Sequence, residues 1–98
     1  MHQDPLIVEV PAGLKPLIGF FFENRQELLD QAEQLSRSGN LTELRAVGHN
    51  FKGACGGYGF HELSRLGEQL QQAQDLEQAR RLLASMRDHL RRAEVVYV

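Results

Sequence analysis

Apolar residues recur every three or four positions in four separate stretches of this 98-residue chain, a spacing typical of amphipathic helices. Between the stretches lie residues that often end or begin helices. Gly39 ends the first, Asn40 begins the second and Asp75 begins the fourth. Glu43 and Gln78 follow the two N-caps by three positions, as in a capping box. Four such helices with short connections predict an all-α fold, an antiparallel up-down four-helix bundle.

The predicted bundle takes up about residues 14–93 of a single domain, 1–98. Its first helix is expected to begin at Leu14, with Pro16 tolerated in the first turn. The N-terminal arm, 1–13, contains PLIVEV and the chain finishes with EVVYV, and these β-branched segments predict short extended structure. The two segments can pair with each other, lie along the bundle or contact a partner. Packing against the bundle is the simplest of these arrangements.

The composition is that of an ordinary globular protein and excludes several classes of function. A net charge of −2 and an isoelectric point near 6.1 argue against nucleic-acid binding. No apolar run is long enough to span a bilayer, and no signal peptide is recognisable. The lone Cys55 suits a reducing compartment and excludes a multi-cysteine metal site. We therefore expect a cytoplasmic protein without membrane partners, with the arginines of its last helix on a solvated face.

Five glycines fall within residues 48–59, GHNFKGACGGYG, although a glycine costs about 1 kcal/mol relative to alanine inside a helix. On a helical wheel, the core stripe of this second helix is Leu41, Leu44, Val47, Phe51, Cys55 and Tyr58. His49 falls on nearly the opposite side. Its neighbours within two turns there are Arg45, Lys52, Gly53 and Gly56. We therefore expect His49 to stand in solvent, where the glycines keep its approach open.

An exposed histidine beside a lysine suits nucleophilic attack on phosphorus. No carboxylate, thiol or second imidazole lies one turn away on that face to complete a metal site, and nothing marks a hydrolytic triad. A neutral imidazole, whose reference pKa is about 6.5, can carry a phosphoryl group as a phosphoramidate. Lys52 would offset the negative charge of that group. The simplest alternative is a surface histidine without a function.

The segment H-N-F-K-G, His49 to Gly53, resembles the H-x-x-K-G signature of histidine-containing phosphotransfer (HPt) domains. The likeness continues through GGYGF and a leucine-rich third helix to EQLQ, and it covers about residues 14–93. It implies a four-helix bundle in which His49 accepts the phosphoryl group through Nε2. Lys52 would then neutralise the phosphoryl oxygens, and Gly53 would leave room for the partner. A glutamine on the next helix supports the histidine in several relatives, and Gln71 stands at the expected place.

Three further residues are candidates for contact with the partner protein. Arg45 and Gly56 share the exposed face of His49. The three phenylalanines at 20–22 cannot all face one core, so we expect an exposed apolar patch there, with Phe22 as the candidate docking residue. The ordinary alternatives are a solvated side chain for Arg45 and packing within the bundle for Phe22.

The sequence thus predicts a phosphocarrier of a bacterial-type multistep phosphorelay. A hybrid sensor histidine kinase or the aspartyl phosphate of a response-regulator receiver domain would phosphorylate His49, and phospho-His49 would pass the group to another receiver. Mg²⁺ would come from the receiver, so no cofactor of the chain's own is expected. The chain has no glycine-rich nucleotide loop, which argues against an autonomous kinase.

Two other classes stay open. One is a docking module that binds receivers or kinases without accepting phosphate. The other is the dimerisation segment of a histidine kinase. That segment is usually a two-helix hairpin with an acid directly after the histidine, where this chain has Asn50.

Overall fold

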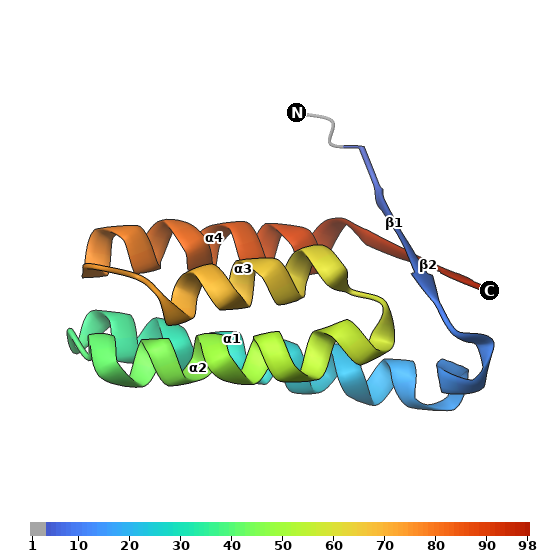
Figure 1. The fold of residues 1–98 in the computed structure, drawn as a ribbon, viewed down its shortest axis with the longest axis horizontal. Coiled ribbons are helices and arrows are strands. Elements are labelled where there is room, and N and C mark those ends of the chain that lie inside the picture. The colour runs from blue at the N-terminus through green and yellow to red at the C-terminus, as the bar shows by residue number, and fades with distance from the viewer. Residues whose placement is uncertain (1–3) are drawn as a thin grey trace.

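Within residues 4–98, the part that the computed structural model describes, four α-helices form one antiparallel bundle (Figure 1). They are α1 (Ile18–Arg37), α2 (Leu41–Cys55), α3 (His61–Gln71) and α4 (Leu76–Arg92). The same part of the chain also contains two 3₁₀ helices and two strands: η1 (Ala12–Leu17), η2 (Gly56–Tyr58), β1 (Leu6–Val10) and β2 (Ala93–Tyr97). The predicted all-α bundle with short extended ends is confirmed. A single chain completes it, which removes the reason to expect a kinase dimerisation hairpin.

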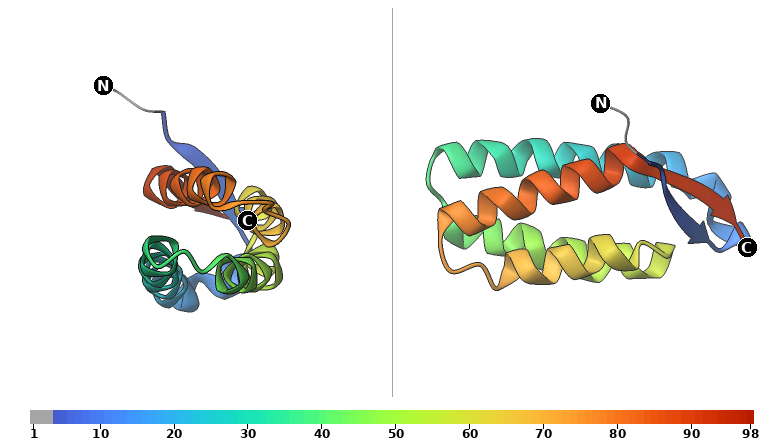
Figure 2. Two further views of the ribbon diagram at one scale, coloured as in Figure 1. Left: turned by 90° about the vertical axis from the view of Figure 1, so that its left-hand side faces the viewer. Right: turned by 90° about the horizontal axis from the view of Figure 1, so that it is seen from above.

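The helices are arranged in a ring, seen end-on in Figure 2, in which α2 contacts α1 and α3, and α4 contacts α3 and α1. The predicted stripes form the core, and burial of each large apolar side chain contributes about 1.5–3 kcal/mol. The largest fully buried side chains of the helices are Leu29, Leu44, Phe51, Leu63, Leu70 and Met86. Of the stripe predicted for the second helix, Leu41 of α2 and Tyr58 of η2 are half-buried, and the other members are buried. The core stripe of the second helix was therefore predicted well, whereas α1 buries Leu29, which lay outside the predicted stripe.

Side-chain caps fix the starts of α2 and α4 as the sequence predicts. The Asn40 side chain accepts a hydrogen bond from the Glu43 amide at 3.1 Å, and Asp75 accepts one from the Gln78 amide at 2.8 Å. Such caps contribute typically about 1 kcal/mol each. Gln78 also accepts from the backbone amide of Gln74 at 2.9 Å, which makes a reciprocal cap at α4.

The first helix begins later than predicted. The α-helix starts at Ile18, not at Leu14, and the residues before it form the 3₁₀ helix η1. Pro16 lies inside η1. Proline has no backbone N–H to donate and disfavours the α conformation at the residue before it, which is Lys15. A tighter 3₁₀ turn therefore replaces the expected first α-helical turn.

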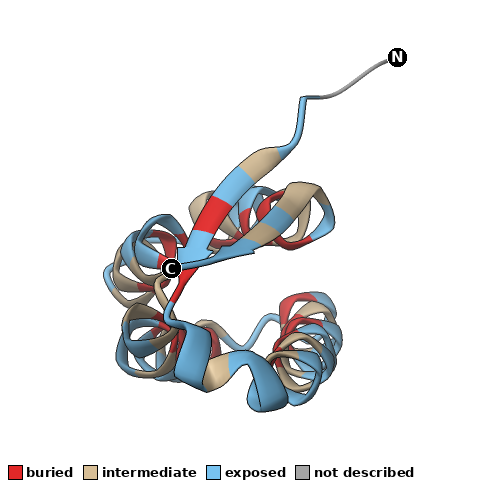
Figure 3. Ribbon diagram, turned by 90° about the vertical axis from the view of Figure 1, so that its right-hand side faces the viewer, coloured by how far each residue is buried: buried red, intermediate tan, exposed pale blue. Residues whose placement is uncertain are grey.

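The two chain ends pair with each other and also pack on the bundle. Strands β1 and β2 run parallel, with Val8 opposite Val95 (Figure 2). Val8 and Val10 are buried, whereas Ile7 and Glu9, which alternate with them along the strand, are exposed, so one face of the ribbon covers the end of the bundle (Figure 3). Two of the three arrangements left open by the sequence thus occur together.

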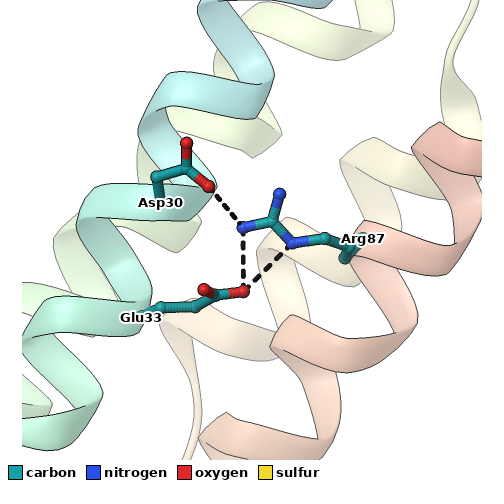
Figure 4. A network of polar contacts seen from close by, with 3 residues as sticks. All are labelled: Asp30, Glu33 and Arg87. Atoms are coloured by element: carbon teal, nitrogen blue, oxygen red, sulfur yellow. Dashed lines mark hydrogen bonds and ion pairs between the residues drawn. The ribbon is translucent and has the colours of Figure 1, made fainter.

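Arginines of α4 cross to α1, so the expectation of a solvated face is only partly right. Arg87 donates to Asp30 at 2.8 Å and to Glu33 at 2.8 and 3.0 Å (Figure 4). Arg80 donates to the Ser36 side chain and carbonyl. The long guanidinium side chains reach a neighbouring helix that a single-helix wheel does not include. None of the described helices is long and apolar enough to cross a membrane.

Candidate functional site

The site rests on a very close approach of α2 and α3. A Cβ atom added at Gly48 would lie 2.5 Å from the Gln71 amide nitrogen and 2.6 Å from the Gly67 carbonyl oxygen. One added at Gly67 would lie 2.7 Å from the Phe51 Cβ atom. Only glycine fits at either position, because backbone atoms occupy the space. Gly48 is therefore buried, and it lets α2 pack closely against α3. This corrects the expectation that the glycines of this stretch serve only to keep the approach to His49 open.

This contact places the exposed His49 of α2 against α3. Its Nδ1 atom lies 3.1 Å from Nε2 of Gln71, which is half-buried at the end of α3. The structure thus places His49 in solvent and Gln71 beside it, as the sequence and the resemblance predict. A ring held through one nitrogen keeps a fixed orientation on the surface.

The Gln71 amide can hydrogen-bond to either neutral form of His49, because it has both a donor and an acceptor. If the Gln71 amide N–H donates to Nδ1, the proton is on Nε2. If the amide turns by 180°, its oxygen accepts from Nδ1–H and leaves a lone pair on Nε2. The second arrangement is the nucleophilic one at Nε2, and the same two residues provide both.

A second polar contact lies next to the first. Nζ of Lys52 lies 3.6 Å from Oε1 of Glu68, and both side chains are about half exposed (47% and 46%). Lys52 follows His49 on α2, and Glu68 precedes Gln71 on α3, by three residues in each case. Because the helices are antiparallel, the pairs His49–Gln71 and Lys52–Glu68 are neighbouring cross-links. Sequence reasoning missed Glu68, although its place in EQLQ put it one turn from Gln71.

The surface beyond Lys52 is open. A Cβ atom added at Gly53 or Gly57 would meet nothing within 4 Å, and one at Gly56 would meet only the Ser64 hydroxyl oxygen at 3.8 Å. These glycines, unlike Gly48, have no packing reason. At these positions no side chain projects from the backbone, so a partner can approach His49 closely.

Residues 16–95 match the family model of the Hpt domain. The chain belongs to this family. No curated protein and no solved structure matches it significantly. Membership assigns the chain to histidine phosphotransfer in two-component signalling, in which Hpt domains interact with receiver domains and kinases.

Arg45 has a structural role in this Hpt domain. Its Nε and Nη2 atoms donate to the carbonyl oxygen of Ala73 at 2.9 and 2.7 Å, and the side chain is half-buried. Arg45 thereby ties the first half of α2 to the connection between α3 and α4. The sequence had placed it simply on the exposed face of His49.

Phe22 lies within the bundle end. Its ring makes edge contacts with Phe21 and Phe60, with centroids 6.0 and 5.5 Å apart, and it is half-buried. Phe20 is the phenylalanine with the exposed ring, at 69% exposure. The structure therefore brings together His49, Lys52 and Gln71, and it gives Phe22 packing contacts of its own.

A buried arginine supports the residue after the histidine, and sequence reasoning missed it. Nη1 of Arg25 donates to the Asn50 side chain at 2.6 Å, and its guanidinium lies 4.8 Å from the Phe51 ring centroid. Its position four residues after buried Phe21 was the available signal. Burial raises the pKa of the nearby Cys55 thiol to about 11, although Arg25 acts in the opposite direction. Cys55 is therefore an inert core residue, as predicted.

The other histidines differ in their surroundings. His61 is exposed, and His2 lies outside the described residues. His89 is only 6% exposed, and among the described residues its buried Nε2 atom has no hydrogen-bond partner. Sequence reasoning gave no sign of this burial. No group of three or more His, Cys, Asp or Glu side chains that could hold a metal ion occurs in residues 4–98.

Proposed function

We propose that His49 carries a phosphoryl group between receiver-domain aspartates, or from a sensor kinase to a receiver, in a bacterial-type multistep phosphorelay. The observation that carries the proposal is the 3.1 Å contact between His49 Nδ1 and the Gln71 amide on an exposed helix face. It holds the ring through the nitrogen that does not react. Nε2 is then the atom offered to the phosphoryl donor.

The transfer needs no proton to enter or leave the site. The lone pair of Nε2 attacks the phosphorus of an aspartyl phosphate as the bond from phosphorus to the aspartate oxygen breaks, and the carboxylate leaves. This step uses the arrangement in which the Gln71 amide is turned by 180°, so that Nδ1 keeps its proton and donates it in a hydrogen bond to the Gln71 side-chain oxygen. The phosphorylated His49 side chain carries one more negative charge than before, which Lys52 offsets. The receiver's acidic pocket supplies Mg²⁺.

The remaining site residues contribute to contact with the partner. Gly53 and Gly56 form the low surface against which the receiver lies, because no side chain there blocks its approach. Arg45 and Phe22 enter the proposal as candidate partner contacts in addition to their contacts inside the bundle. The exchange would take place in the cytoplasm, since the free thiol of Cys55 suits a reducing compartment.

The test is phosphotransfer from a small panel of phosphorylated receiver domains. Label should appear on the protein, resist base and be lost in acid, as expected for a phosphoramidate. His49→Gln should abolish it. His61→Gln, which removes another exposed histidine, should retain it.

The competing function is a docking module that accepts no phosphate. It would be favoured if no receiver transferred label while several bound the wild type and His49→Gln with equal affinity. In that case the open glycine surface would serve binding alone.

A further inference from the structure

The neighbouring cross-links His49–Gln71 and Lys52–Glu68 place one cation and one carboxylate beside the reacting ring. They lie close because Gly48 and Gly67 allow the backbones of α2 and α3 to touch. Lys52 thus already has an anionic partner, Glu68, at 3.6 Å before any phosphoryl group arrives. The helices also meet at the two glycines and through buried leucines, so this pair is not their only contact.

Phosphorylation changes the charge balance of this group. Transfer of the phosphoryl group, written as PO₃⁻, breaks its bond to the donor aspartate oxygen and forms the bond to Nε2, and it adds one negative charge to His49. Lys52 then faces two anions, the phosphoryl group and the Glu68 carboxylate, with a single positive charge. Its flexible stem and compact ammonium let it turn from one to the other.

We propose that Glu68 tunes how readily phospho-His49 gives up its phosphoryl group, by competing for Lys52 and by repelling the new charge. This inference rests on the proposed function of His49. Glu68 is a positioning residue: it acts through Lys52 and makes the phosphorylated state less stable than Lys52 alone would make it. Delivery of the group to the next aspartate is thereby favoured over its retention on His49.

The test is the equilibrium of phosphotransfer between one receiver domain and the protein, measured for wild type and Glu68→Gln. The variant should hold more phospho-His49 at equilibrium, by about two- to five-fold, the range expected for an exposed ion pair. The difference should shrink as salt is added, because exposed charges are screened. Glu68→Asp, which keeps the charge, should lie closer to wild type than to Glu68→Gln.

A matched control comes from the same helix. Glu62 is an exposed carboxylate on α3 that pairs with Arg65, and Glu62→Gln removes the same charge away from Lys52. It should leave the equilibrium unchanged. In a Lys52→Met background, Glu68→Gln should lose most of its effect, since the two residues act on one charge.

The outcomes separate this inference from the proposed function. If wild type accepts no phosphoryl group from any receiver, the proposed function fails. If wild type is phosphorylated but Glu68→Gln gives the wild-type equilibrium, or changes it equally with and without Lys52, the tuning role is wrong. A purely structural Glu68 would lower the melting temperature in the variant and leave the equilibrium unmoved.

Discussion

Single residues of the glycine-rich segment meet different demands. Gly48 lacks a side chain because the backbone of α3 occupies the space, whereas the space beside Gly53 is empty. Gly59 has φ of 91°, a left-handed conformation, and the Glu9 carbonyl oxygen would lie 2.2 Å from an added Cβ atom. Packing and backbone geometry explain Gly48 and Gly59. Neither reason applies to Gly53, which fits the proposed role of keeping access to His49 open.

Alanine at two of these glycines should change stability in opposite directions. Gly48→Ala should lower the free energy of unfolding by about 1–3 kcal/mol, because α2 and α3 must move apart. Gly53→Ala should raise it by up to about 1 kcal/mol, because the methyl group meets nothing and alanine favours the helix. Urea denaturation followed by circular dichroism measures both. Equal losses in the two variants would contradict the assignment.

The same Gly53→Ala variant tests the access argument separately from stability. Its methyl group would project toward the receiver, so transfer from a phosphorylated receiver should slow several-fold. Phosphorylation by a small donor such as phosphoramidate, which needs no docking surface, should keep the wild-type rate. A variant that was slow with both donors would point to a disturbed His49 instead.

Among the helices and their connections, Arg45 links elements that are distant in sequence. Its two hydrogen bonds to the Ala73 carbonyl oxygen should make Arg45→Ala lose about 1–2 kcal/mol of unfolding free energy. Arg81 is the matched control, because its side chain is 72% exposed and it pairs with Glu77, one turn away on its own helix. Arg81→Ala should stay within about 0.5 kcal/mol of wild type. Equal unfolding free energies for both variants would leave Arg45 with a surface role only.

At the scale of helices and strands, the sequence predicted the features that depend on neighbouring residues within one element. The caps at Asn40 and Asp75 and the apolar stripes depend on residues within one or two turns. Both caps were right, but the buried face of α1 also includes Arg25 and Leu29, which lay outside the predicted stripe. The later start of α1 followed from Pro16, whose effect on its own turn was underestimated. Glu68 and the parallel pairing of β1 with β2 depend on how separate elements align, which periodicity along one element does not contain.

At the scale of the whole molecule, the chain ends close the end of the bundle. Val98 accepts a hydrogen bond from the Ala12 amide and donates one to the Val10 carbonyl, each at 3.0 Å, which extends the ribbon at its far end. The two-stranded ribbon lies next to α4, because Val8 of β1 and His89 of α4 line the same hollow. Phe60 lies against the His89 ring with centroids 6.2 Å apart. Global stability should therefore respond to the charge on His89.

Burial lowers the pKa of His89 below its ordinary value of 6.5, against the opposing influence of Glu62 and Asp88. As the pH falls below 6.5, the unfolded chain binds a proton at His89 before the folded protein does, so the free energy of unfolding should decrease. The decrease should stop once the pH passes below the folded pKa. The lowered pKa values of Glu62 and Asp88 act in a separate window, below their ordinary values of 4.5 and 3.8.

Urea denaturation between pH 8 and pH 5 should thus show stability falling with pH in the wild type and a flatter profile in His89→Leu. The leucine keeps an apolar contact with Phe60 and removes the titrating nitrogen, so any general loss of packing would displace the whole profile without changing its slope. Parallel profiles for the two proteins would mean that His89 takes up its proton equally well in the folded and unfolded states. The ribbon would then not shield the imidazole, and the link between the chain ends and acid sensitivity would be wrong.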